Sequence, residues 1–392
     1  MLRTSAAPDA RAESGRRVVT VVACMQGATA LGYYAVMAHL VAHLRDDVGL
    51  LAGTIALVLG LRVAVQYALF LPFGSLVDRI APRRAGMLAC GLRAVAFGLL
   101  GVAGDLGTLL AAALALAVGG ALLHPSVQSV LAGLPPGRRS RGFGIYVVTG
   151  QIAAVAGPPA GLALLVGGFE LLAAVGAAAW VVMALMFALL PRTVTSGGEA
   201  GARPLLRGVA DVVRDRAFLR FAVVTAPGTL LATQVVTVVP LGATGAGEAT
   251  LFFCAGAVGA AGIQPFVARR GRGGRSWVLR AGLLCAGSGY LLVAALPGVA
   301  DWRMAVLVAA ALVNGAGTGL IQTGSFHTIV RCAPEGRVGS AIGVANFVAG
   351  AVALAGGLVV GRLFDAGAET AALAGLAALG TVSAVAYRRP AP

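Results

Sequence analysis

Charged residues are scarce in this chain of 392 residues: they make up 11% of it, and lysine is missing altogether. A soluble domain carries about a quarter charged residues, so a water-soluble body of this size is excluded. Hydrophobic residues make up 58% of the chain, and many apolar runs reach the roughly 20 residues that a membrane-spanning helix needs. The solvent for most of the chain is therefore lipid.

Paired cysteines and clusters of metal-ligating residues are also missing. The five cysteines are scattered, mostly inside apolar runs, and none forms a Cys-x-x-Cys pair. Neither a zinc site nor a disulfide framework is indicated, and we expect no metal and no cofactor. A membrane-embedded enzyme would cluster His, Asp, Glu or Cys at one membrane face, and a membrane sensor would carry an appended soluble domain. Both are remote alternatives, and we expect no enzyme.

The formal net charge of +15 comes entirely from arginine. A basic balance of this size is also typical of nucleic-acid binding, but the arginines fall in short clusters between apolar runs. That placement is how membrane topology is encoded, so we expect a lipid bilayer and no nucleic acid as the partner.

Apolar runs between the charge clusters predict twelve spans, six in each half of the chain. The first six lie at about 18–43, 52–77, 85–103, 108–132, 142–166 and 171–190, and the second six at about 217–240, 250–268, 277–296, 304–330, 338–360 and 370–387. The expected organisation is a tail at 1–17, a six-helix bundle at 18–190, a central loop with an amphipathic helix at 191–216, a second bundle at 217–387 and a tail at 388–392.

Arginine placement orients these spans. Clusters precede the first span and follow every second one, whereas the opposite loops carry only Arg45, Arg303 and Arg362. The positive-inside rule then places both termini in the cytoplasm, and we expect a multi-pass protein of the plasma membrane. The first apolar run is too long for the core of a cleaved signal peptide.

The two halves of the chain resemble each other. LPPGRRSRGFGIYV (134–147) is similar to APEGRVGSAIGVA (333–345), and Gly157 and Gly356 are separated by the same interval. Two six-span halves related by a parallel repeat are a transporter architecture, with the binding site near the membrane midplane between them.

The stretch GSLVDRIAPRR (74–84), between the second and third spans, resembles a signature of the major facilitator superfamily. The matching functional positions are Gly74, Asp78, Arg79, Arg83 and Arg84, while Ala81 stands where glycine is usual. The resemblance implies an all-α membrane protein with twelve helices in two pseudo-symmetric bundles. It also implies that this loop is a conformational latch, with Asp78 beside the positive end of the span that begins near Val338. The alternative is plain topology signalling.

A second stretch, AAVAGPPAGLAL (153–164), is similar to the antiporter signature of the same superfamily at Gly157, Pro158 and Gly161. This resemblance implies export by antiport, as in the twelve-span drug/proton antiporter branch. Ala153 and Leu162 replace two glycines of that signature, and ordinary packing of small residues between helices is nearly as good an explanation.

Carboxylates are missing from the middle of every predicted span, although the chain has 15 of them. Proton relays in membranes use buried carboxylates or histidines, so histidine is the remaining candidate. His124 and His327 lie on the fourth and tenth spans, which the resemblance places at the central cavity, and His327 matches Gln128 in the repeat. The alternative is a histidine hydrogen-bonded between helices.

Two arginines lie well inside predicted spans: Arg62 in the second and Arg93 in the third. A central arginine costs on the order of 3 kcal/mol on insertion scales, so each must face protein or water. A structural tether and a functional charge are both open for Arg62, and a tether is favoured for Arg93.

Other candidates are polar residues on the spans expected to line the cavity: Gln26, Tyr33, Gln234, Asn314 and Gln322. They stand among many small apolar residues, which suits hydrophobic or amphipathic molecules better than sugars. We expect a monomeric secondary transporter that exports such compounds by alternating access, with protons as the coupling ion. An importer or uniporter of a small metabolite is the alternative.

Overall fold

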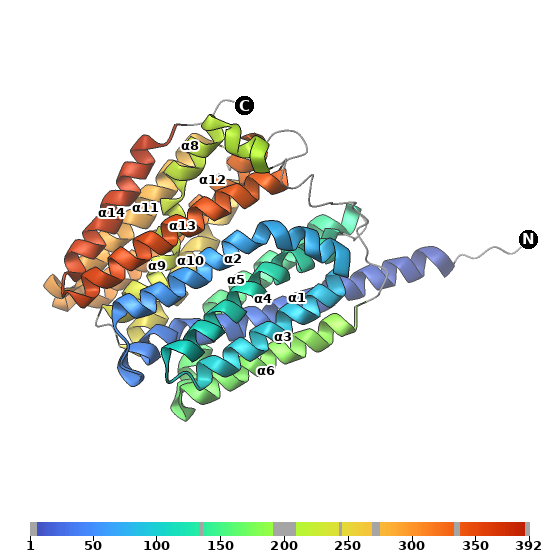
Figure 1. Cartoon of the computed structure of the whole chain (residues 1–392), viewed down its shortest axis with the longest axis horizontal. Helices are drawn as coiled ribbons and strands as arrows, with labels where there is room; N and C mark the ends of the chain where they lie inside the picture. The colour runs from blue at the N-terminus through green and yellow to red at the C-terminus, as the bar shows by residue number, and fades with distance from the viewer. Residues whose placement is uncertain are drawn as a thin grey trace, which may run out of the picture.

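The structure is a computed structural model of the chain, and it describes residues 6–132, 136–190, 209–242, 245–268, 275–332 and 338–388. Within these ranges the regular elements are helices (Figure 1). Twelve segments of the described chain are long and apolar enough to cross a membrane, which confirms the predicted number of spans.

The first half contains six long helices and a π-helical turn. They are α1 (Ala6–Ala42) with the turn His43–Asp47, α2 (Ala52–Ile80), α3 (Pro82–Gly101), α4 (Leu106–Ala132), α5 (Pro136–Leu164) and α6 (Phe169–Ala188). Helix α1 thus begins well before the predicted span. We call the end of the molecule where α1 ends and α2 begins the loop end, and the opposite end, where α2 ends and α3 begins, the tail end.

The second half repeats this pattern with one interruption. Its helices are α8 (Arg216–Thr225), α9 (Pro227–Leu241), α10 (Ala246–Ala268), α11 (Ser276–Ala294), α12 (Arg303–Cys332), α13 (Val338–Asp365) and α14 (Glu369–Ala386). The predicted span 217–240 is therefore two helices, α8 and α9. Pro227 causes the break because it has no N–H to continue the backbone ladder.

The helices form two bundles, as the fold class predicted. In the first, α1 packs on α5, and α3 packs on α4 and α6; in the second, α12 packs on α10 and α11, and α11 on α14. The bundles meet where α2 lies against α13 and α5 lies against α10. Figure 1 shows α2 and α13 running side by side at this boundary.

Glycine allows α2 and α13 to approach closely. A Cβ atom added to Gly361 would lie 2.7 Å from the Ala56 Cβ and 2.8 Å from the Gly53 Cα. Further along the pair, a Cβ on Gly60 would lie 3.1 Å from the Leu354 side chain. Small residues at such contacts are how membrane helices pack when no hydrophobic force drives them together.

Acidic side chains cap the N-termini of two helices, α8 and α4, by accepting hydrogen bonds from free backbone N–H groups. Asp215 accepts from the Ala217 and Phe218 N–H groups at α8. At the loop end, Asp105 accepts from the Thr108 N–H at 3.0 Å and the Thr108 hydroxyl at 2.6 Å. These bonds favour the carboxylate and hold the pKa of Asp105 below its ordinary value.

The amphipathic helix expected in the central loop lies partly outside the described residues. The described part is helical at 209–214, where Val212 is buried.

Candidate functional site

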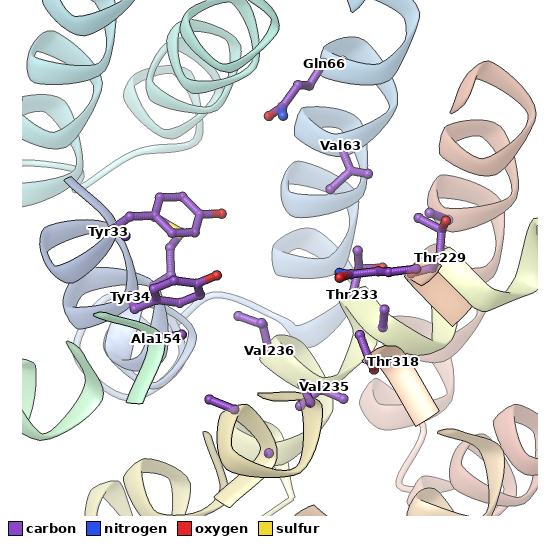
Figure 2. A pocket seen from close by; sticks show the side chains of 18 of the residues that line it. Tyr33, Tyr34, Val63, Gln66, Ala154, Thr229, Thr233, Val235, Val236 and Thr318 are labelled. Atoms are coloured by element: carbon purple, nitrogen blue, oxygen red, sulfur yellow. The ribbon is translucent and has the colours of Figure 1, made fainter. Parts of the chain in front are cut away.

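A cavity of about 1470 Å³ lies between the two bundles. Helices α1, α2, α4 and α5 contribute to the wall formed by the first bundle, and α9, α10, α12 and α13 to the wall formed by the second. Figure 2 shows Tyr33 and Tyr34 pointing into this space, with Thr229, Thr233 and Thr318 on the opposite side. A cavity therefore lies between the two bundles, where the half repeat predicted a binding site.

The bundles are joined at the loop end of the cavity. The Gly53 N–H, in the first turn of α2, donates to the Asp365 carboxylate at 2.8 Å. The Arg45 guanidinium donates to the Leu241 carbonyl at the end of α9. Each contact places a charge on a helix terminus of opposite partial charge. Together with the close approach of α2 and α13, they cap the cavity on this side.

Toward the tail end the cavity extends almost the full length of the helices. Its lining reaches Ser129 on α4, Ile329 on α12 and Ile342 on α13, each within a turn of its helix end. The three hydrogen bonds between described residues that join the bundles, including Cys254 to the Val155 carbonyl, all lie in the loop-end half. The described hydrogen bonds between the bundles thus lie at the loop end, and the cavity lining extends toward the tail end.

The two walls differ in chemistry. The first wall carries the charged and titratable lining residues: Arg62, Arg93, His124 and four tyrosines at 33, 34, 67 and 146. The second wall carries neutral amides and hydroxyls among alanine, valine and phenylalanine. Among the lining residues that the structure describes there is no aspartate or glutamate, so the cavity is electropositive on one side.

Arg93 extends from α3 into the first wall, although a tether was favoured for it. Its side chain is 6% exposed, and the guanidinium carbon lies 4.7 Å from the Trp180 ring centroid and 5.6 Å from the Tyr33 ring centroid. These aromatic faces stabilise a desolvated cation. Its Nε has no hydrogen-bond partner among the described residues. Arg93 is thus held by aromatic rings and still lines the cavity.

Arg62 lines the cavity from α2, one turn from Gln66. The Arg62 Nε and the Gln66 Oε1 are buried and have no hydrogen-bond partner in the described chain. The sequence prediction missed Gln66. Its spacing of four from Arg62 was the available signal, because residues i and i+4 share a helix face.

The two histidine candidates differ in their position relative to the cavity. His124 lines the cavity from α4 and is exposed to it, with its ring 5.8 Å from the Phe70 ring. His327 is exposed beside Phe326 but is not among the lining residues. The lining stripe of α12 runs through Thr318, Gln322 and Phe326, and the next residue along is turned by about 100°. Its expected place at the cavity is therefore corrected. Gln128 lies in α4, but its side chain is outside the described residues.

The remaining polar candidates all line the cavity. Gln26 and Tyr33 do so from α1, Gln234 from α9, and Asn314 and Gln322 from α12. Asn314 also donates to the Ala286 carbonyl at 2.9 Å, which ties α12 to α11. The Gln234 Oε1 is buried without a hydrogen-bond partner in the described chain.

The expected latch lies at the tail end. Gly74, Asp78 and Arg79 belong to the last turns of α2, and their side chains are outside the described residues. Arg83 donates to the Ala188 carbonyl at the end of α6, and Arg84 is exposed. Between α2 and α3, Ala81 has a φ of 71°. That conformation favours the glycine that the family usually has at this position.

The antiporter-like residues of α5 pack against α1 of the same bundle. A Cβ on Gly157 would lie 2.6 Å from the Tyr34 Cβ, and one on Gly161 would overlap the Ala35 carbonyl oxygen. The Pro158 carbonyl is 3.0 Å from the buried His39 Nε2. The motif therefore fixes α5 to α1 within one bundle. His39 was missed because its partner lies 119 positions away in the sequence.

Comparisons with known proteins agree with this architecture. Residues 22–357 match the model of the Major Facilitator Superfamily. An uncharacterized MFS-type transporter of Mycobacterium tuberculosis is 29% identical over 380 residues, which are 92% of this chain and 90% of that protein. The multidrug resistance protein MdtH of Shigella dysenteriae is 29% identical over 212 residues, 54% of this chain and 52% of that protein.

Solved transporters share the fold at low sequence identity. The nucleoside transporter NupG superposes with a TM-score of 0.78 at 13% identity, over 94% of this chain and 98% of that chain. A peptide transporter POT, crystallised with sulfate, superposes with a TM-score of 0.77 at 16% identity, over 94% of this chain and 93% of that chain. The chain is a multi-pass membrane transporter, not an enzyme, and belongs to the major facilitator superfamily.

Proposed function

We propose that the protein exports small hydrophobic or amphipathic compounds across the plasma membrane, coupled to protons, as a member of the drug/proton antiporter branch. The observation that carries the proposal is the cavity. Its volume of about 1470 Å³ exceeds the roughly 300–1,000 Å³ of ordinary ligand pockets. Alanine, valine and phenylalanine alternate in its wall with hydroxyl, amide and tyrosine side chains, a mixture that suits amphipathic compounds. The multidrug resistance relatives, similar over half of the chain, favour the same substrates.

His124 is the group that we assign to the proton. It lines the cavity in a wall that has no carboxylate among its described residues, and histidine is the side chain whose charge changes near neutral pH. Exposure to the cavity would let it take up and release a proton as access alternates.

Arginine placement supports the orientation of the transporter. With the positive-inside rule, both termini and the tail end would face the cytoplasm, and the loop-end contacts would close the outer side of the cavity. A single chain encloses the whole cavity, and we propose that it works as a monomer.

An importer or uniporter of a small metabolite is the second candidate. The lack of any carboxylate among the described lining residues favours it, because intramembrane carboxylates are the commonest proton carriers.

The test uses purified protein in liposomes that contain a pH-sensitive dye. A gradient of one compound at a time, from lipophilic cations, neutral drugs and organic anions, is imposed without a pH gradient. Proton movement opposite to the substrate flux establishes proton-coupled antiport, as the export proposal requires. Substrate flux without proton movement establishes a uniporter.

The histidine assignment has a matched pair of variants. His124→Gln should abolish substrate-driven proton movement while substrate binding persists. His327→Gln, which lies off the lining stripe of α12, should behave like the wild type. Normal proton coupling in His124→Gln would remove this residue as the carrier.

A further inference from the structure

The charges on the first wall of the cavity lack a counter-charge. Arg62 and Arg93 both line it, and no carboxylate does so within the described chain. The two arginines lie close enough for their charges to act on each other. A cation inside a membrane needs a partner or water, and two cations beside one cavity attract an anion most strongly.

Both guanidinium groups have an N–H donor without a hydrogen-bond partner in the described chain. These donors are the Nε atoms of Arg62 and Arg93, and both atoms are buried. The rings of Trp180 and Tyr33 lie near the Arg93 guanidinium at centroid distances of 4.7 and 5.6 Å. Such rings stabilise the charge without accepting its N–H groups in the ring plane. Guanidinium N–H pairs match a carboxylate, sulfonate or phosphate group with two parallel bonds.

Helix packing brings a third polar group to the same place. A Cβ on Gly120 of α4 would lie 2.6 Å from the Gln66 Oε1 and 2.7 Å from the Arg93 Nη2. Gln66 and Arg93 therefore come together over a glycine, from α2 and α3. The Gln66 amide supplies a further N–H donor to an anion bound there, and Figure 2 shows its side chain extending from α2 at this wall.

The second wall suits an apolar body. Val235 and Val236 of α9 lie across the cavity from the tyrosines (Figure 2), and Phe252 and Phe253 of α10 belong to the same lining. Neutral threonines and amides separate them. A molecule that spans the cavity therefore meets positive charge at one end and an uncharged, partly apolar surface at the other.

We propose that the cavity binds amphipathic organic acids, with the anionic head group at Arg62 and Arg93 and the apolar part against the second wall. The inference rests on the proposed export function, because it narrows the substrate class of that same cavity. It also gives the buried arginines a binding role besides that of structural tethers.

The test compares three ligands of nearly the same shape. They are 1-naphthaleneacetate, its neutral primary amide, and the (1-naphthylmethyl)trimethylammonium cation. Binding of each to the full-length protein in detergent is measured by isothermal titration at pH 7.5, where the acid is ionised. Charge-assisted hydrogen bonds predict that the acid binds about 10- to 100-fold more tightly than the amide, and the cation should bind most weakly.

Variants locate the effect. Arg62→Gln and Arg93→Gln should each remove most of the preference for the acid, while Arg62→Lys should keep part of it. Arg280→Gln is the matched control, because Arg280 is outside the lining and donates to the Tyr387 carbonyl. If Arg93→Gln fails to fold, the Arg62 pair decides alone.

Each outcome is decisive. Equal affinities for the acid, the amide and the cation, undetectable binding of the acid, or an unchanged preference in Arg62→Gln would overturn the proposal. Inorganic phosphate binding as tightly as naphthaleneacetate would reduce the site to one for any anion, which also overturns it. Proton movement with another compound in liposomes, alongside equal affinities, leaves export standing without the acid preference. Tight binding of the acid with no proton movement keeps the acid preference and removes proton-coupled export.

Discussion

The loop end and the tail end of the molecule are both formed in part by α2 and α13, which run in opposite directions. At the loop end, the acid that ends α13, Asp365, accepts the Gly53 N–H in the first turn of α2. At the tail end, Asp78 stands in the last turns of α2, and α13 begins at Val338. Because the helices are antiparallel, an acid at the end of each one is available to the start of the other. Only the loop-end contact lies within the described side chains.

We propose that Asp365 and Asp78 are latches that act in turn. A carboxylate at a helix N-terminus satisfies free N–H groups and meets the positive end of the helix dipole. When the loop end is closed, as here, Asp365 has that role. Closure of the tail end would give the role to Asp78. Removing one acid should therefore shift the population of states opposite to removing the other.

Gly361→Leu should have the largest effect on this balance. A Cβ there would overlap Ala56 and Gly53 of α2, and overpacking costs about 1–3 kcal/mol, so the loop end should open. Pulsed EPR on a background without native cysteines would show it. A spin-label pair at Val166 and Trp302, both strongly exposed near the loop end, should move apart, while a tail-end pair at Leu189 and Trp277 should come together.

Gly375→Leu is the control for that measurement. Gly375 lies on α14, where an added Cβ meets nothing within 4 Å, so neither distance should change. Unaltered distances in Gly361→Leu would show that α2 and α13 do not seal the loop end.

Asp365→Ala should have a smaller effect in the same direction. Loss of a capping side chain costs about 1 kcal/mol, so the loop-open population should rise about fivefold. The same spin-label pairs report it. Asp301→Ala, which removes another exposed acid near the loop end, is the control. A population identical to the wild type would reduce Asp365 to a surface charge.

Much of the fold and part of the cavity followed from the sequence. Long apolar runs and arginine clusters determine the number of spans, because lipid requires each crossing segment to satisfy its own backbone. Arg62, Tyr33 and His124 were found because a polar group inside a span is costly unless it faces a cavity or a partner. His327 shows the limit of this reasoning. Its neighbour Phe326 lines the cavity, but the sequence does not give the rotation of α12, and a shift of one residue turns a side chain away from the cavity.

The loop-end contacts could not be predicted in this way. Asp365 and Gly53 are 312 positions apart, and neither residue type is unusual at a helix end. Arg45 counted in the sequence only as an exception to the positive-inside pattern, yet it donates to the Leu241 carbonyl of the other bundle. The contact between Trp180 on α6 and Arg93 could not be predicted either, because it depends on how α3 and α6 pack.

Asp78→Asn should shift the balance the other way and by less. If Asp78 holds the tail end closed, its loss favours the tail-open state. Because the loop-end contacts are already formed in the structure, little population remains to be moved. A cysteine introduced at Ser325, toward the tail end of the cavity lining, should react faster with a polar maleimide. Unchanged labelling would leave the loop as a topology signal.

Ala81→Gly should have the smallest effect, and it acts on the turn between α2 and α3. Ala81 has a φ of 71° and a ψ of 140°, a conformation that costs a residue with a Cβ about 1–3 kcal/mol. Glycine removes this cost but adds about 0.4–1 kcal/mol of unfolded-chain entropy, so the thermal midpoint should rise slightly. Ala94→Gly, in the interior of α3, should lower it by the ordinary helix penalty of about 1 kcal/mol. A fall in both variants would mean that the turn is not strained, and the departure from the family's glycine would then cost nothing.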